Sequence, residues 1–201
     1  MAIAINGSSN TITGIAVGGL PNGIVDTDML ADDSVTAPKI GSKTFTSYAL
    51  IADQKAHDVD GGAFTAGAWR QRDLNTEISD PDGIVSITAD SDFTLQAGSY
   101  LVKASAPAFG VTRHMILLRN TTTDTDVQFG TSEYAHNTYL CQTRSFLTSR
   151  FTIASATNFG IFHRCVVSKT VNGFGVGTDI PTSGGVDITE RYTIVEIYKE
   201  A

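Results

Sequence analysis

From Thr46 onward, apolar and polar residues alternate in short runs, which is the pattern of β-strands with one buried face. The clearest run extends from Tyr100 to Ala106, where every second residue is apolar or small and the residues between include Lys103 and Ser105. Turns rich in glycine, aspartate and asparagine separate the runs, and no window shows a helical period. This pattern predicts about ten strands and favours an all-β sandwich or jelly roll.

The first 45 residues follow another pattern, a ten-residue quasi-repeat in which an aliphatic residue recurs at every fifth position. The repeated residues are Ile15, Leu20, Val25, Leu30, Val35 and Ile40. This spacing fits neither a helix nor a strand, so these side chains need a partner surface, which sister chains around an axis can supply. We predict an extended arm at 1–45 for attachment and oligomerisation, and a β-sandwich domain at 46–201. The alternative for the arm is a linker with coincidental spacing.

The amino-acid composition also favours β-strands over helices. The chain has 26 Thr but only 5 Glu, 6 Lys and 10 Leu, so residues that fill helix surfaces are scarce. The net charge is −7 and no stretch concentrates Lys or Arg, which argues against nucleic acid and anionic membranes as partners. No apolar run approaches the roughly 18 residues of a membrane span, so we expect no membrane insertion.

Catalytic patterns are weak. The four histidines are scattered, and none lies near a nucleophile motif. Glu77, Asp80 and Asp82 form a carboxylate cluster that could hold calcium or serve a hydrolase, but Asp-Pro-Asp-Gly at 80–83 is also a favourable turn. We therefore predict that the chain is no enzyme and binds no cofactor or metal.

The two cysteines have no metal-ligand spacing. Cys141 and Cys165 are far apart in the chain, without any Cys-x-x-Cys motif. His163 and Cys165 share one face of a predicted strand, yet two ligands fall short of the four that structural zinc requires. We expect buried, reduced thiols.

Aromatic and amide side chains gather in the loop at 132–139. Its candidate ligand-binding residues are Tyr134, His136, Asn137 and Tyr139. Flat rings can stack on the C–H face of a sugar and amides can bind its hydroxyl groups, so a host-surface glycan is a candidate partner. The alternative is a plain surface loop. Trp69, which follows a glycine-rich loop, could bind a sugar or could instead fill the sandwich or an oligomer interface.

The final strand is apolar on both faces, with Ile194 and Tyr198 on one side and Val195 and Ile197 on the other. A strand in a two-layer sandwich buries one face in the core, so another subunit is expected to cover the second face. This pattern predicts that Ile194 and Tyr198 lie in an oligomer interface; the alternative is an ordinary inner strand of the sandwich.

Two runs in the body resemble the signature of C1q/TNF-like jelly-roll domains. In RDLNTEISDPDGIVSI at 72–87 and DFTLQAGSYLVKASAPAF at 92–109, an Asn-Thr-Glu strand and an Asp-Pro-Asp-Gly turn precede an apolar strand. Later segments such as HMILLRNTTT and YTIVEIYKEA are similar to the C-terminal domains of bacteriophage tail-fibre proteins. The segment GIVDTDMLADDSVTAPKI at 23–40 is similar to the fibre repeats that precede such domains.

The resemblance implies a homotrimer with the last strand near its axis. It also implies a structural protein of the phage virion, assembled in the host cytoplasm: a tail fibre or fibre tip that attaches to other virion proteins through 1–45 and contacts the host surface. The alternative is a capsid decoration (cement) protein or head fibre of the same trimeric type. The collagen-like Gly-X-Y stem of vertebrate C1q is missing, so a role in complement is not implied.

Overall fold

The structure, a computed structural model, describes residues 4–6, 11–13, 45–178, 180, 185 and 187–201. The chain divides into two units, Met1–Lys43 and Thr44–Ala201. In the first unit β1 (Ala4–Asn6) pairs antiparallel with β2 (Thr11–Thr13), a short hairpin that the hydrophobic pattern did not predict. The predicted arm also includes Phe45, which opens the strand Phe45–Lys55. The repeat residues lie outside the described residues: Ile15, Leu20, Val25, Leu30, Val35 and Ile40.

Every regular element in the described part of the second unit is a strand. The strands are β3 (Phe45–Lys55), β4 (Arg70–Gln71), β5 (Thr76–Ser79), β6 (Val85–Ile87), β7 (Phe93–Leu95), β8 (Gly98–Phe109), β9 (Thr112–Asn120), β10 (Thr125–Phe129), β11 (Glu133–Ala135), β12 (Gln142–Ile153), β13 (Thr157–Cys165) and β14 (Glu190–Glu200). None of the described segments forms a helix long and apolar enough to cross a bilayer.

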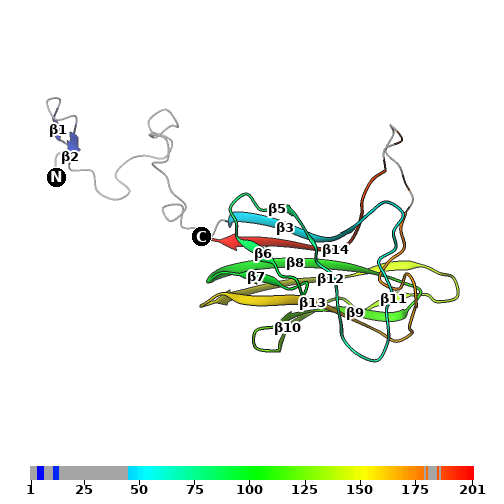
Figure 1. Cartoon of the computed structure of the whole chain (residues 1–201). Coiled ribbons are helices and arrows are strands. Elements are labelled where there is room, and N and C mark those ends of the chain that lie inside the picture. The colour runs from blue at the N-terminus through cyan, green and yellow to red at the C-terminus, as the bar shows by residue number, and fades with distance from the viewer. Residues whose placement is uncertain (1–3, 7–10, 14–44, 179, 181–184, 186) are drawn as a thin grey trace. The chain divides into compact units, whose positions relative to one another are not determined.

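These strands form two antiparallel sheets that pack against each other (Figure 1). One sheet has five strands in the order β12-β8-β14-β3-β5. The other has seven strands, in the order β10-β9-β13-β7-β6 with β11 beside β9 and β4 beside β13. The last strand, β14, pairs on both edges, with β3 and with β8, so it lies inside its sheet rather than at an edge. The predicted all-β sandwich is confirmed.

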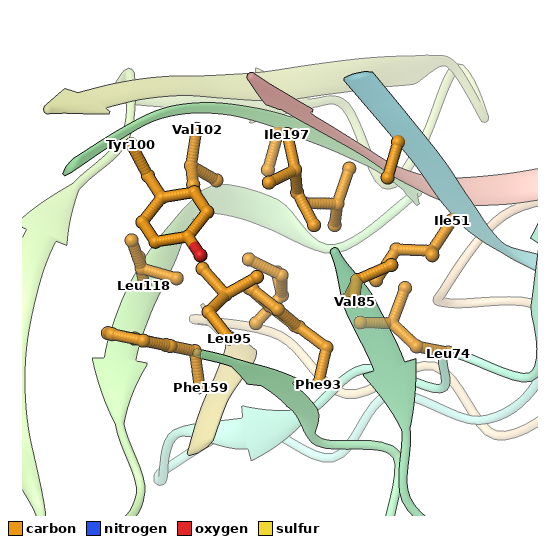
Figure 2. Packing of buried hydrophobic residues seen from close by; sticks show 14 of the residues in the cluster. Ile51, Leu74, Val85, Phe93, Leu95, Tyr100, Val102, Leu118, Phe159 and Ile197 are labelled. Atoms are coloured by element: carbon orange, nitrogen blue, oxygen red, sulfur yellow. The ribbon is translucent and has the colours of Figure 1, made fainter. Parts of the chain in front are cut away.

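The main core lies between the two sheets and contains side chains of both. Figure 2 shows Ile51, Tyr100, Val102 and Ile197 of the five-stranded sheet lying across from Phe93, Leu95, Leu118 and Phe159 of the seven-stranded sheet. Along β8, buried residues alternate with half-buried or exposed ones from 100 to 106, as the sequence pattern predicted. The two-residue period of a strand therefore decides which side chains enter the core.

A second, smaller apolar cluster packs near the loop at 172–177. Its buried members are Phe64, Ala108, Val111, Ala135 and Cys165. The ring of Phe174 lies 4.4 Å from that of Phe64. The loop is anchored by backbone bonds, since the Phe174 N–H donates to Gly62 and the Gly175 N–H donates to Asn172. This packing leaves little free space beside the glycines of the loop.

Gly175 is the glycine for which we expect the most damaging substitution. Its φ is +135°, and an added Cβ would lie 2.4 Å from the ring of Tyr192 and 3.1 Å from Pro107. Gly175→Ala should therefore lower the free energy of unfolding by about 3 kcal/mol, because backbone strain and overpacking add. Gly62→Ala is the matched control: its φ is +105° with no atom within 4 Å, so it carries the backbone cost alone. Urea denaturation measures the free energy of unfolding of both variants. An equal loss in Gly175→Ala and Gly62→Ala would contradict the packing argument.

Candidate functional site

A groove of about 760 Å³ lies over β9, β11 and β13 of the seven-stranded sheet. We call it the Trp69 groove. The residues that shape it include Trp69, Arg113, Met115, Tyr134, Arg164 and Val166. The volume falls within the usual range of roughly 300–1,000 Å³ for small-molecule sites, so the groove is a candidate binding site.

Strand register places the groove residues on the outer face of the sheet. Tyr134 of β11 pairs with Arg113 of β9, and Arg164 of β13 pairs with Met115 of β9. Neighbouring residues in the same strands point the other way and are buried, as His114 is. Because successive side chains alternate between faces, these three strands present their polar and aromatic groups together.

Two aromatic rings border the groove. The ring of Trp69 is half-buried and lies 5.9 Å from that of Phe129, a residue of β10 that is itself half-exposed. The structure therefore places Trp69 on the outer face of the seven-stranded sheet and not inside the sandwich. Tyr134 is 50% exposed, and its ring lies 5.8 Å from His136 in an edge-on arrangement.

The loop at 132–139 contributes only part of its predicted residues to the groove. Tyr134 lines it, whereas His136, Asn137 and Tyr139 do not. The ring of His136 accepts hydrogen bonds from the backbone N–H groups of Thr138 and Tyr139, at 3.1 and 3.2 Å. His136 thus holds the loop in shape, while Tyr139 projects into solvent with 82% of its surface exposed.

Arg113 and Arg164 are exposed cations with no acidic group within 4.0 Å among the described residues. Two other arginines of the sandwich do form ion pairs: Arg119 lies 2.8 Å from Asp126, and Arg150 lies 2.6 Å from Glu200. Sequence reasoning missed Arg113 and Arg164. The alternating pattern of the two strands predicts that both side chains point outward. Only the strand register shows that they are neighbours on adjacent strands.

Beneath the groove lies a buried histidine pair. His114 Nδ1 and His163 Nε2 share a hydrogen bond of 3.0 Å, and His114 Nε2 lies 2.8 Å from the Thr143 hydroxyl. Burial lowers the pKa of His114 to about 4, helped by the positive charge of Arg72. The same causes, together with His114, hold the pKa of His163 well below its usual value. Both rings are therefore neutral at pH 7 and form an uncharged layer under the groove.

The carboxylate cluster at 77–82 has a structural explanation. Asp80 accepts hydrogen bonds from the backbone N–H groups of Ile84 and Val85, both at 2.9 Å. Gly83 adopts φ +63°, which completes the predicted turn. In the residues that the structure describes, no three His, Cys, Asp or Glu side chains are grouped so as to hold a metal ion.

Both cysteines are free thiols. Cys165 is buried, and this burial raises the pKa of its thiol to about 11. Cys141 is only half-buried, which corrects the expectation of two buried thiols, and its sulfur accepts the N–H of His136 at 2.8 Å. His163 is hydrogen-bonded to His114 rather than paired with Cys165 as a metal ligand.

A second surface lies on the outer side of the five-stranded sheet, and we call it the β14 face. It is built from apolar side chains that come together in register: Tyr48, Leu101, Phe146, Ile194 and Tyr198. Ile194 and Tyr198, predicted to share one side of the last strand, both lie on this face, while Val195 and Ile197 are buried in the core.

The chain is similar to several solved structures. The Eiger TNF domain from S. frugiperda matches with a TM-score of 0.50 at 10% identity, covering 77% of this chain and 92% of that one. The body of this chain is a C1q/TNF-like jelly roll. Murine APRIL at pH 8.0 matches the jelly roll with a TM-score of 0.46 at 8% identity, covering 79% and 99% of the two chains. The globular domain of zebrafish complement 1qA gives 0.42 at 10% identity, covering 76% and 94%. Neither a family model nor a curated protein matches the sequence.

Proposed function

We propose that this chain is a structural subunit of a bacteriophage virion, a homotrimeric tail fibre or fibre tip. In this proposal residues 1–45 attach to other virion proteins, and the jelly roll contacts the host surface. The support is the resemblance of 23–40 and of the body to phage fibre proteins, together with one structural observation, the apolar β14 face.

The β14 face carries the trimer proposal because it exposes rings and aliphatic groups in a continuous row. Tyr198 lies between Tyr48 and Leu101 in register, and its ring is 5.0 Å from that of Tyr48 and 5.1 Å from that of Phe45. Phe45 is 50% exposed and Phe146 is 52% exposed. A sandwich needs only one apolar face per sheet, so a second one is explained by a partner that covers it.

Charged groups on the same face suit a specific contact between identical subunits. Lys103 lies over the ring of Tyr198 at 5.5 Å, and the Tyr198 hydroxyl donates to Glu196 at 2.5 Å. A shallow hollow of about 180 Å³ between Phe146 and Ile194 can accept a side chain of a neighbour. Repetition of one such contact around an axis closes a ring of subunits, and threefold presentation would multiply weak contacts with the host by avidity.

Light scattering tests the trimer. We expect the full chain to have three times the 21.3 kDa mass of the monomer. Phe146→Asp should weaken association by roughly a hundredfold, because a carboxylate buried without a partner costs several kcal/mol. Phe146 is half-exposed in a single chain, so the fold should survive, as circular dichroism can check. Val171→Asp, at a somewhat more exposed position outside the β14 face, should remain trimeric. A monomeric unmodified chain would refute the trimer.

Adsorption competition tests the proposed role. Free trimer is expected to block phage adsorption to its host, and antibodies against it should label the tail. Labelling of the head without any block of adsorption would instead support a capsid decoration protein or head fibre. That result would remove the host-contact proposal and leave the trimer intact.

A further inference from the structure

The Trp69 groove combines two features on one surface, open aromatic rings and two exposed arginines without ion pairs among the described residues. Trp69 and Tyr134 come from different segments and border the same groove. Flat rings of this kind bind the C–H face of a pyranose, because the sugar presents an apolar patch surrounded by hydroxyl groups. The aromatic pair therefore favours a saccharide ring over an extended peptide.

The two arginines of the groove favour a ligand that carries a negative charge. Arg164 pairs with Met115, and Arg113 precedes Met115 by two residues, so the two arginines are diagonal neighbours on adjacent strands. Diagonal neighbours in a sheet are roughly 7–8 Å apart, within reach of two long side chains that converge on one ligand group. Guanidinium groups offer paired N–H donors that match the oxygens of a carboxylate or a phosphate.

The surroundings of the two arginines also favour an anionic ligand at this groove. The protein carries a net charge of −7, so an anionic ligand needs local cations to bind it. Neither Arg113 nor Arg164 has an acidic neighbour within 4.0 Å in the described ranges. Below them, both ring nitrogens of His114 are already occupied, by His163 and by Thr143. The groove lining also includes the carboxylate of Glu133, which forms no ion pair within 4.0 Å with either arginine among the described residues. Arg113 and Arg164 are thus the cationic groups of the groove that a negatively charged ligand would bind.

We infer that the Trp69 groove binds an acidic saccharide, a pyranose that carries a carboxylate or a phosphate. The sugar ring packs against Trp69 and Tyr134, and its anionic group binds Arg113 and Arg164. This inference rests on the proposed function, in which the jelly roll contacts the host surface, and it names the class of surface group recognised. Asn137 and Tyr139 take no part in it.

Titration calorimetry of the full chain provides the test, with tetragalacturonic acid as the carboxylate probe and glucose 6-phosphate as the phosphate probe. Maltotetraose is the neutral probe, and we expect at least one acidic probe to bind tenfold or more tightly than it does. The Arg113→Gln/Arg164→Gln variant should reduce that affinity at least tenfold. Raising the salt concentration should weaken binding as well, because exposed charges are screened. The identity of the acidic probe that binds distinguishes carboxylate from phosphate.

Two variants outside the groove serve as controls. Arg191→Gln removes one exposed arginine from β14, and Asn137→Ala removes the amide of the loop; both should bind the acidic probe as the unmodified chain does. Equal affinity for maltotetraose, an unchanged Arg113→Gln/Arg164→Gln variant, or no binding of either acidic probe would each overturn the inference. Adsorption competition tests the proposed function separately. If the Arg113→Gln/Arg164→Gln variant still blocks phage adsorption, the jelly roll contacts the host through another surface than the groove.

Discussion

Replacing Arg72 by alanine is expected to lower the free energy of unfolding by about 3–5 kcal/mol, since removal of one charge from a buried set leaves the others uncompensated. Arg72 is 1% exposed. Its Nε donates to the Thr193 hydroxyl at 2.8 Å and its Nη2 donates to the carbonyl of Phe174 at 2.9 Å. The guanidinium also lies 4.1 Å from the centre of the Phe174 ring. Arg72 thus ties the core side of the loop at 172–177 to β14.

The charge of Arg72 also matters to Asp53, a carboxylate that is almost fully buried. Burial raises the pKa of Asp53, and the positive charges of Lys55 and Arg72 oppose that rise. Burial lowers the pKa of Arg72 to about 9, with Asp53 again opposing the shift, so the guanidinium remains charged at pH 7. Without Arg72, Lys55 is the one cation left beside Asp53 among the described residues, and its Nζ lies 3.2 Å away.

A double-mutant cycle separates the lost charge from the lost packing. Arg72→Met keeps much of the side-chain volume, and Asp53→Asn removes the opposite charge. We expect the double variant to be less destabilised than the sum of the two single variants in urea denaturation. Arg191→Ala, at an exposed position, should change stability by less than about 0.5 kcal/mol. A loss below about 1 kcal/mol for Arg72→Ala would contradict the structural role assigned to Arg72.

Stability is also expected to fall as the pH drops from 6.5 towards 4. In the folded state the pKa of His114 is about 4, against an ordinary value of 6.5. Below pH 6.5 the unfolded chain takes up a proton that the folded chain does not, so the folded state loses stability until the pH reaches about 4. The largest loss for His114 alone is about 3 kcal/mol. His163 acts in the same direction, and the raised pKa of Asp53 acts in the opposite one.

Urea midpoints between pH 7 and pH 5 measure this effect, because most carboxylates stay ionised there. The free energy of unfolding should change by up to about 1.4 kcal/mol per pH unit for each histidine that stays neutral in the folded state. This slope corresponds to one proton taken up on unfolding. His163→Phe is the matched variant: the ring lies 4.7 Å from Phe64, so a phenyl group can replace it, and the slope should become shallower. A stability that does not change with pH over this range would refute the buried neutral pair.

Much of the fold could be predicted from local pattern. Alternation along 100–106 identified the buried residues of β8, and the two-sided last strand placed Ile194 and Tyr198 on the opposite face from the core. The turn at 80–83 was also predicted, since its hydrogen bonds join residues only four or five apart in the chain. Such features depend on backbone geometry over a few residues, which is why a single sequence reveals them.

The groove could not be predicted in the same way. Trp69, Arg113, Tyr134 and Arg164 come from four separate segments, and they meet because β9 lies between β11 and β13 in one particular register. The loop at 132–139 shows the limit of prediction from composition. Its rings and amides are typical of a sugar site, but the ring of His136 accepts hydrogen bonds from the backbone of its own loop. Local composition does not reveal which groups already have partners.

The sequence by itself determined the class of fold, the residues that enter the core of β8 and the apolar character of both faces of β14. These follow from the strand period and from short-range turns. Only the tertiary structure decided which outward side chains are neighbours, which arginines keep a free charge, and that His114, His163 and Arg72 share one buried site. The reason is physical: strand pairing joins residues far apart in the chain, and both burial and charge compensation depend on those pairings.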